Sequence, residues 1–212
     1  MVRAGSKWLL AVVVLVLVGL LTFTVYAMTS RSQLVELPDK KTNSVSDLPN
    51  QNLDEASKVR EFIKQKNRYL TEAEVNRLTM AFLSSSKANG VDLWLLLSVA
   101  ASESHFRADV ISGAGCIGIM QIKPTTAYSV GIDPDSLYNP ERNIEAGTRY
   151  LRRLLDKYDD ESLAVAAYNA GPSRVTTSVP AIRETRQYVQ KVSAKRNELA
   201  ALFGAVSIAK SE

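Results

Sequence analysis

The chain has 212 residues, of which 46% are hydrophobic, and it carries 26 Lys and Arg against 22 Asp and Glu. This length fits one domain of ordinary size rather than two large ones. With one cysteine, Cys116, and one histidine, His105, the chain cannot form an intrachain disulfide, and a metal site built from His and Cys clusters is effectively excluded. The net charge of +4 suits an anionic polymer or surface, but it does not choose between nucleic acid, anionic lipid and cell wall.

The N-terminal segment is the first informative stretch of the chain. It is apolar through most of residues 8–28, and no charged residue falls between Lys7 and Arg31. Because about 20 apolar helical residues cross the hydrocarbon core of a bilayer, residues 1–28 are predicted to form a single membrane-spanning anchor. The basic residues before the run favour an N-terminus inside the cell and an exported body. The alternative is a signal peptide that is cleaved near Ala27.

Residues 29–60 are predicted to be a linker. They are rich in Ser, Asn, Asp and Pro and show no sustained period, so they have little apolar surface to bury. Near the end of this stretch a first helix can start at about Asp54, with Val59 and Phe62 on its apolar face. We therefore place the folded domain at residues 61–205.

The pattern of apolar residues in this domain is helical. Thr71 and Glu74 fit a capping box, and the helix that they start should end at Gly90. Asp92 can cap the next helix, residues 93–104, which is apolar nearly all round and should form the buried centre. Further helices are expected over 123–130, over 143–155 with Asn143 as its cap, over 161–169 and over 182–202. No stretch shows a convincing strand alternation, so the predicted fold is all-α.

Glu103 is the strongest candidate for a catalytic group. It stands at the end of the apolar helix, where ionised carboxylates are rarely placed without a partner or a purpose. A carboxyl beside apolar groups has a raised pKa, and cleavage of a glycosidic bond needs a donor that is still protonated near neutral pH. The structural alternative is a helix-terminal Glu that reaches solvent or pairs with Arg107.

Two further clusters have residue types that suit ligand binding. Residues 113–121 contain glycines at positions 113, 115 and 118, which permit a tight turn and close approach of a ligand chain, and Gln121 offers both a donor and an acceptor. In residues 166–171, Tyr168 and Asn169 stand at a predicted helix end, where side chains can point into a cleft. Taken singly, the first cluster is an ordinary turn and the second is an ordinary helix C-terminus.

Together these stretches resemble the catalytic domain of the soluble lytic transglycosylase family over about residues 85–195. Five motifs occur in the family's order: Glu103-Ser104-x-Phe106, Gly118-Ile119-Met120-Gln121, Asn139-Pro140 with Asn143-Ile144, Gly147 and Tyr150-Leu151, then Ala167-Tyr168-Asn169-Ala170-Gly171-Pro172, and Glu184-Thr185-Arg186-x-Tyr188-Val189. The departures from the family's pattern are His105, Arg107, Ala108 and Cys116. The resemblance implies a goose-type-lysozyme-like helical domain, here after an N-terminal transmembrane helix and linker.

The resemblance implies a peptidoglycan lytic transglycosylase that needs no metal or other cofactor. Glu103 would protonate the oxygen between N-acetylmuramic acid and N-acetylglucosamine, and would then activate the muramoyl 6-hydroxyl, which closes a 1,6-anhydro ring. Tyr168 would hydrogen-bond Glu103, and Ser104 would orient the substrate or Glu103. Met120 and Gln121 would line the glycan subsites. The expected substrate-binding residues are Ser104, Met120, Gln121, Tyr168 and Asn169.

Two alternatives stay open, a non-catalytic peptidoglycan-binding scaffold and a lysozyme-like hydrolase that uses Asp109. Any of these could serve a secretion, conjugation or phage-entry system. The expected partners are peptidoglycan glycan strands, the bacterial inner membrane through residues 1–28, and envelope-spanning machinery. No nucleic-acid partner is expected, because no dense basic patch with stacking aromatics is visible. The catalytic domain should lie in the periplasm or cell-wall space, or be secreted if the chain is cleaved near Ala27.

Overall fold

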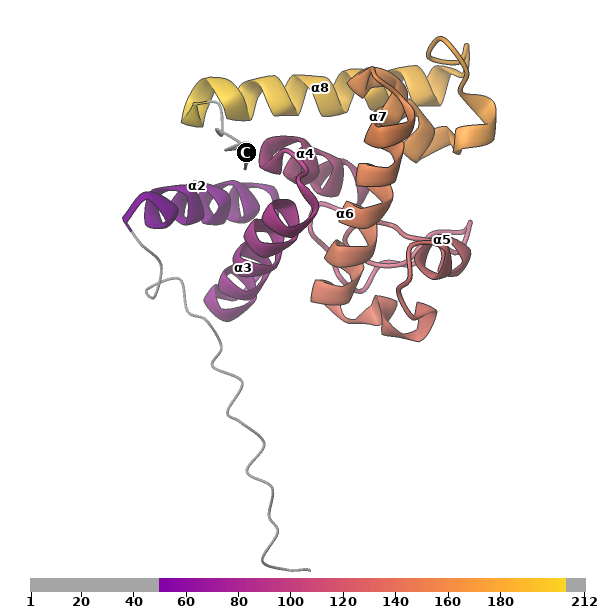
Figure 1. The fold of residues 1–212 in the computed structure, drawn as a ribbon. Helices are drawn as coiled ribbons and strands as arrows, with labels where there is room; N and C mark the ends of the chain where they lie inside the picture. The colour runs from indigo at the N-terminus through magenta and orange to yellow at the C-terminus, as the bar shows by residue number, and fades with distance from the viewer. Residues whose placement is uncertain (1–49, 205–212) are drawn as a thin grey trace, which may run out of the picture. The chain divides into compact units, whose positions relative to one another are not determined.

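The computed structural model describes residues 50–204, and every regular element in this range is helical (Figure 1). The predicted anchor, residues 1–28, and the predicted linker up to residue 49 lie outside the described residues. Within 50–204, no helix is long and apolar enough to cross a membrane. The elements in chain order are α2 (Asn50–Lys66), α3 (Glu72–Asn89), α4 (Leu93–Glu103), α5 (Pro124–Ser129), η2 (Pro134–Tyr138), α6 (Pro140–Lys157), α7 (Glu161–Ala170), η3 (Pro172–Arg174) and α8 (Arg183–Phe203).

The helix α4 forms the centre of this domain, as its sequence predicts. Residues 93–101 are all buried, because a helix that is apolar all round is stable only when every face is covered. The helices α8 and α3 pack against it, while α2 packs on α3, and α6 packs on both α3 and α7. The helix α7 also packs on α8, so the C-terminal end of α4 lies between elements that are distant in sequence.

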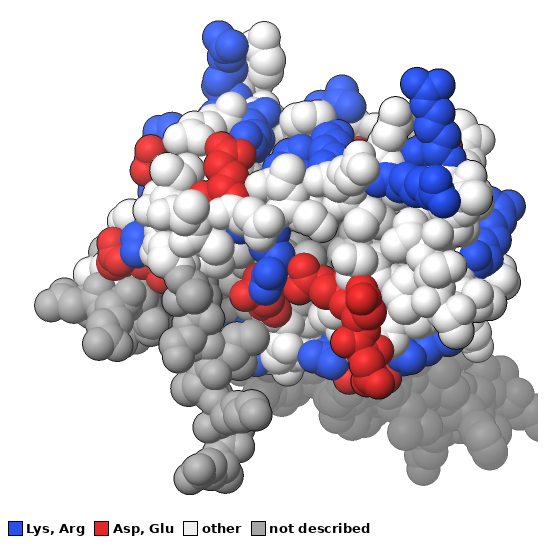
Figure 2. Space-filling model, turned by 90° about the horizontal axis from the view of Figure 1, so that it is seen from above, with Lys and Arg blue, Asp and Glu red and all other residues white. Residues whose placement is uncertain are grey.

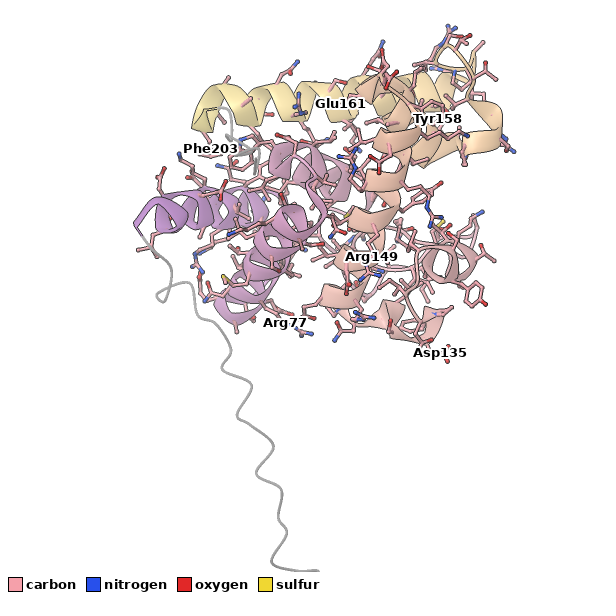
Figure 3. The ribbon with its side chains drawn as sticks, in the orientation of Figure 1. Arg77, Asp135, Arg149, Tyr158, Glu161 and Phe203 are labelled. Carbon is pink, nitrogen blue, oxygen red and sulfur yellow. The ribbon has the colours of Figure 1, made fainter. Side chains whose placement is uncertain are left out.

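The N-terminal end of α4 is tied to the end of α8. The ring of Trp94 lies 5.7 Å from that of Phe203, which Figure 3 labels. The Trp94 Nε1 donates to the carbonyl of Gly204 at 3.0 Å, and the Lys58 ammonium of α2 donates to the carbonyl of Phe203 at 3.2 Å. These contacts fix the direction in which α8 crosses α4 and therefore which α8 residues reach Glu103 at the other end.

The predicted caps of α3 and α4 are confirmed. Glu74 N donates to the Thr71 side chain at 3.3 Å, and the Glu74 carboxylate accepts from Thr71 N at 2.8 Å, which completes the capping box. Gly90 ends α3 with a φ of 60°, a left-handed conformation that glycine adopts without strain. Asp92 caps α4 by accepting from Leu95 N at 2.7 Å. Local sequence is sufficient to set these boundaries.

The predicted linker boundary at residue 60 is wrong. The helix α2 begins at Asn50, and both Ala56 and Val59 have no exposed surface. The first residues of this helix are mostly polar, so the sequence pattern does not reveal its short apolar stripe. This stripe packs against α3. Residues 50–60 therefore belong to the folded domain.

The predicted cap of α6 is also wrong. The helix begins at Pro140, a residue that is favoured at the first helical position. Its cap is Asn139, which accepts from Arg142 N at 3.0 Å. Asn143 therefore lies inside the first turn of the helix and is free for a different role.

Asn143 holds the glycine-rich turn against α6. Its buried Nδ2 donates to the carbonyls of Ile117 at 2.8 Å and Leu137 at 3.0 Å, and its Oδ1 accepts from Met120 N at 2.8 Å. A Cβ at Gly118 would stand 2.6 Å from this Nδ2, so the turn can approach α6 only because position 118 is glycine. The turn is therefore fixed by tertiary hydrogen bonds.

Candidate active site

Glu103 is the last residue of α4, and its carboxyl is held by α8. The Tyr188 hydroxyl donates to Glu103 Oε1 at 2.6 Å. About one turn further along α8, the Lys191 ammonium donates to the carbonyl of Ser102 at 3.4 Å, and its charge acts on Glu103. Glu103 and Arg107, whose pairing the sequence left open, form no ion pair with each other, and Arg107 Nε donates to the carbonyl of Ser104.

Burial raises the pKa of Glu103 from its ordinary value of 4.5 to about 7. Two groups act in the opposite direction, since the hydrogen bond from Tyr188 and the charge of Lys191 both favour the carboxylate. The effect of burial is larger than both together. A carboxyl with this pKa exists in both protonation states near neutral pH, so it can donate a proton in one step and accept one in the next.

The turn after Glu103 is strained and closely held. Ser104 has no exposed surface, and its Oγ donates to the carbonyl of Ile119 at 2.8 Å. Ser104 therefore joins the end of α4 to the glycine-rich turn, and its expected role in orienting the substrate or Glu103 stays a prediction. His105 and Phe106 have φ values of 54° and 61°, a region that costs non-glycine residues energy. This reversal buries Phe106 and leaves His105 exposed.

Met120 is buried, whereas its motif predicts that it lines a glycan subsite. Its side chain has no exposed surface and lies on α6 at Gly147, where a Cβ would stand 2.5 Å from the Met120 Cβ. The absence of a side chain at position 147 creates the space that Met120 fills. Its contribution is to packing beneath the turn.

Gln121 remains a candidate for substrate binding. It is partly exposed, and it has a φ of 49°, a left-handed conformation that turns its side chain back over the loop. Its Nε2 donates to the carbonyls of Gly118 at 2.9 Å and Val110 at 3.2 Å. These bonds use the donor end of the amide, so the amide oxygen is oriented with the acceptor side away from them.

The predicted hydrogen bond from Tyr168 to Glu103 is not formed. The Tyr168 hydroxyl donates to the carbonyl of Met120 at 2.9 Å, and its ring lies 5.3 Å from that of Tyr150. Because the hydroxyl has a single proton, this bond leaves none for Glu103. Tyr168 therefore stabilises the glycine-rich turn through the carbonyl of Met120. The hydrogen bond to Glu103 that we expected from Tyr168 comes from Tyr188.

Asn169 links α7 to α8. It is partly buried, and its Oδ1 accepts from the Thr185 hydroxyl at 3.0 Å. Thr185 is itself buried in the first turn of α8, and Tyr188 follows one turn later. This link therefore sets the rotation of α8 about its axis, and with it the direction of the Tyr188 hydroxyl toward Glu103.

Tyr188 is the site residue that the sequence reasoning missed. It is present in the closing motif that carries the resemblance, but no local feature distinguishes it from other tyrosines. The informative feature would have been its spacing: on a helix, Tyr188 and Lys191 are three residues apart and lie on one face, which the structure turns toward the end of α4.

Replacement of Tyr188 by Phe is expected to raise the pKa of Glu103 further above 7. The hydroxyl stabilises the carboxylate, so its removal leaves the ionised form buried without its donor. The titration of the Glu103 carboxyl carbon by NMR measures this pKa directly. The matched control is Tyr168→Phe, which removes a hydroxyl that bonds Met120 instead and should change the value less. A larger shift in the control would contradict the assignment of these two tyrosines.

Comparison with known proteins identifies relatives of this domain. Residues 80–190 match the family described as Transglycosylase SLT domain. A transglycosylase of Enterobacteria phage PRD1 is 33% identical over 116 residues, which are 55% of this chain and 42% of that protein. Membrane-bound lytic murein transglycosylase C of Glaesserella parasuis serovar 5 is 36% identical over 121 residues, 49% of this chain and 33% of that protein. The chain thus spans less than half the length of these relatives.

Solved structures show the same relationship. The lytic transglycosylase Slt of Pseudomonas aeruginosa, in an inactive mutant form, matches with a TM-score of 0.54 at 29% identity, covering 60% of this chain and 24% of that one. The 70 kDa soluble lytic transglycosylase of Escherichia coli matches with a TM-score of 0.57 over 78% of this chain and 32% of that one. At 23% identity this second match concerns the fold alone. Because the family match at residues 80–190 covers more than half of the chain, the chain belongs to the transglycosylase SLT domain family.

Proposed function

We propose that this protein is a peptidoglycan lytic transglycosylase that cleaves the β-1,4 bond between N-acetylmuramic acid and N-acetylglucosamine. The observation that carries the proposal is the carboxyl of Glu103, whose pKa burial raises to about 7. An acid with this pKa is still protonated in a large fraction of molecules at neutral pH, as cleavage of a glycosidic bond requires. The membership of the chain in the SLT family supports the same reaction.

In the proposed reaction, Glu103 acts twice. As an acid, it transfers its proton to the glycosidic oxygen while the bond from that oxygen to C1 of the muramoyl residue breaks. As a base, the resulting carboxylate accepts the proton of the muramoyl 6-hydroxyl, whose oxygen forms the new bond to C1. The product has a 1,6-anhydro end, no water is consumed, and Glu103 ends in its starting protonation state.

The surroundings of Glu103 favour one carboxylate over two. A two-carboxylate glycosidase keeps its second carboxyl within about 10 Å of the first, where its charge would raise the pKa of the acid. Among the described residues, the charge that acts on Glu103 is the positive one of Lys191. Asp109, the residue on which a hydrolase would depend, is exposed in the loop after α4.

The finer features of the assignment belong to the same proposal. The fold would be the goose-type-lysozyme-like one. Gln121 would bind the glycan strand, and the turn and helices around Glu103 would be held in position by Ser104, Met120, Tyr168 and Asn169. Residues 1–28 would anchor the domain to the bacterial inner membrane with the site in the periplasm. The apolar run of residues 8–28 supports this placement, and one relative is named a membrane-bound enzyme.

The test is a digest of purified peptidoglycan by the full chain, followed by mass spectrometry of the released fragments. We expect fragments that end in 1,6-anhydro-muramic acid, which are lighter by one water than hydrolysis products. Reducing muramic acid ends would identify a hydrolase instead and would direct attention to Asp109. A folded protein that sediments with the wall and releases nothing would favour the binding scaffold.

A further inference from the structure

A group of basic side chains from three segments lies beside the catalytic end of α4. The face of the molecule that carries α8 displays Lys and Arg side chains at many separate places, and the acidic side chains gather in fewer places (Figure 2). The group next to Glu103 combines the last turn of α2, the strained turn after α4 and the middle of α8. We call these five residues the basic cluster: Lys66, His105, Arg107, Lys191 and Lys195.

Three members of the cluster are placed by hydrogen bonds and helix geometry. The Lys191 ammonium donates to the carbonyl of Ser102 at 3.4 Å, and the Arg107 guanidinium donates to the carbonyl of Ser104 at 3.1 Å. The two carbonyls that these cations contact belong to the residues on either side of Glu103. Lys195 stands four residues after Lys191 and so lies on the same face of α8.

The other two members are placed by aromatic contacts. The Lys66 ammonium lies 5.2 Å from the centre of the Phe62 ring, and this ring packs edge to face on Phe106 at 5.9 Å. Phe106 is buried, while His105 immediately before it is exposed through its left-handed backbone. The strained turn therefore directs the imidazole outward into the space that the end of α2 and α8 share.

The cluster has an excess of positive charge that the domain does not neutralise. Within residues 50–204, none of its four Lys and Arg side chains forms an ion pair. Although His105 is exposed, its neighbours displace part of the water around the imidazole and so lower its pKa, and the four cations lower it further. Burial and the charges of Lys191 and Lys66 also lower the pKa of Lys195, against which only Glu198 acts. Like charges held together in this way repel one another and favour an anionic ligand.

We propose that the basic cluster binds carboxylates of the stem peptide that is attached to the muramoyl residue at Glu103. This proposal rests on the proposed function. Tyr188, which contacts Glu103, and Lys195 are seven residues apart, or about 10 Å along α8. Three extended peptide residues span about the same length. A stem peptide that leaves the sugar at Glu103 can therefore follow α8 and bring its carboxylates to the cluster.

The first test compares peptidoglycan strands that carry stem peptides with strands from which an amidase has removed them. Lys195→Gln should raise KM for the peptide-bearing strands about two- to fivefold, the range of a solvent-accessible ion pair, without a change in kcat. On the stripped strands it should behave as the wild type. The matched control is Lys87→Gln, which removes one charge from the exposed surface of α3 and should affect neither substrate. An equal effect of Lys195→Gln on both substrates would overturn the proposal.

The second test does not depend on turnover. His105 is the chain's one histidine, so its imidazole resonance is identified without ambiguity in the full chain carrying Glu103→Gln. A disaccharide-tripeptide from peptidoglycan should raise the pKa of His105, because a bound carboxylate favours the imidazolium. The proposal fails if the value does not move, or if inorganic phosphate or vesicles containing phosphatidylglycerol raise it equally. If the wild type cleaves neither kind of strand, the proposed function fails, while this titration still decides whether the cluster binds stem peptide.

Discussion

Replacement of Glu103 by Gln is expected to lower the release of 1,6-anhydro fragments about a thousandfold or more, the contribution of a positioned general acid. The amide has nearly the same shape as the carboxyl and can still accept the Tyr188 hydrogen bond through its oxygen. It cannot, however, donate a proton to the glycosidic oxygen or accept one from the muramoyl 6-hydroxyl. The measurement is the initial rate of fragment release from purified peptidoglycan by the full chain, with circular dichroism to confirm the fold.

The matched control for this experiment is Asp109→Asn. This substitution also removes one carboxylate from the same segment of the chain. Asp109 is exposed, however, and it is not among the groups that shift the pKa of Glu103. We expect its rate to stay within about twofold of the wild type, since exposed substitutions have small effects. Comparable losses in the two variants, together with products that carry reducing ends, would indicate a two-carboxylate hydrolase. Substantial turnover by Glu103→Gln would remove the basis of the assignment.

The parts of the fold that the sequence predicts are those set by neighbours in the chain. The capping box of Thr71 and Glu74, the cap at Asp92 and the glycine at position 90 each depend on residues within a few positions. The apolar character of α4 is likewise visible in the sequence, and it implies a buried helix whatever its partners are. Glu103 could be selected for the same reason, because a carboxyl at the end of such a helix is conspicuous.

The predictions that differ from the structure concern contacts between segments that are distant in the sequence. Two tyrosines, at positions 168 and 188, are equally suited by chemistry to hold Glu103, and only the crossing of α8 over α4 decides between them. A glycine-rich motif suggests that Met120 is accessible. In the structure its side chain is buried against α6, in the space left by the absence of a side chain at Gly147. Asn143 has the residue type of a cap, and its actual role is visible only once the turn is seen against α6. Each choice depends on tertiary packing, which local patterns do not encode.

The same features that prepare Glu103 for acid chemistry should make the domain less stable as the pH rises. Between about pH 4.5 and 7, the folded protein keeps the proton on Glu103, while the unfolded chain has already lost it. The folded state then binds more protons, so the free energy of unfolding decreases with pH through this window and becomes level above it. A shift from 4.5 to about 7 corresponds to a loss of about 3 kcal/mol.

Urea unfolding of the wild type and Glu103→Gln at pH 4, 6 and 8 would measure this effect. The amide of the variant has no charge to bury, so the stability of Glu103→Gln relative to the wild type should increase by about 3 kcal/mol between pH 4 and pH 8. Other groups, such as Glu55 and Glu161, whose pKa values burial also raises, contribute equally to both proteins and cancel in the difference. If the difference between Glu103→Gln and the wild type were independent of pH, burial would not hold the proton on Glu103, and the proposed acid would lack the property on which its first catalytic step depends.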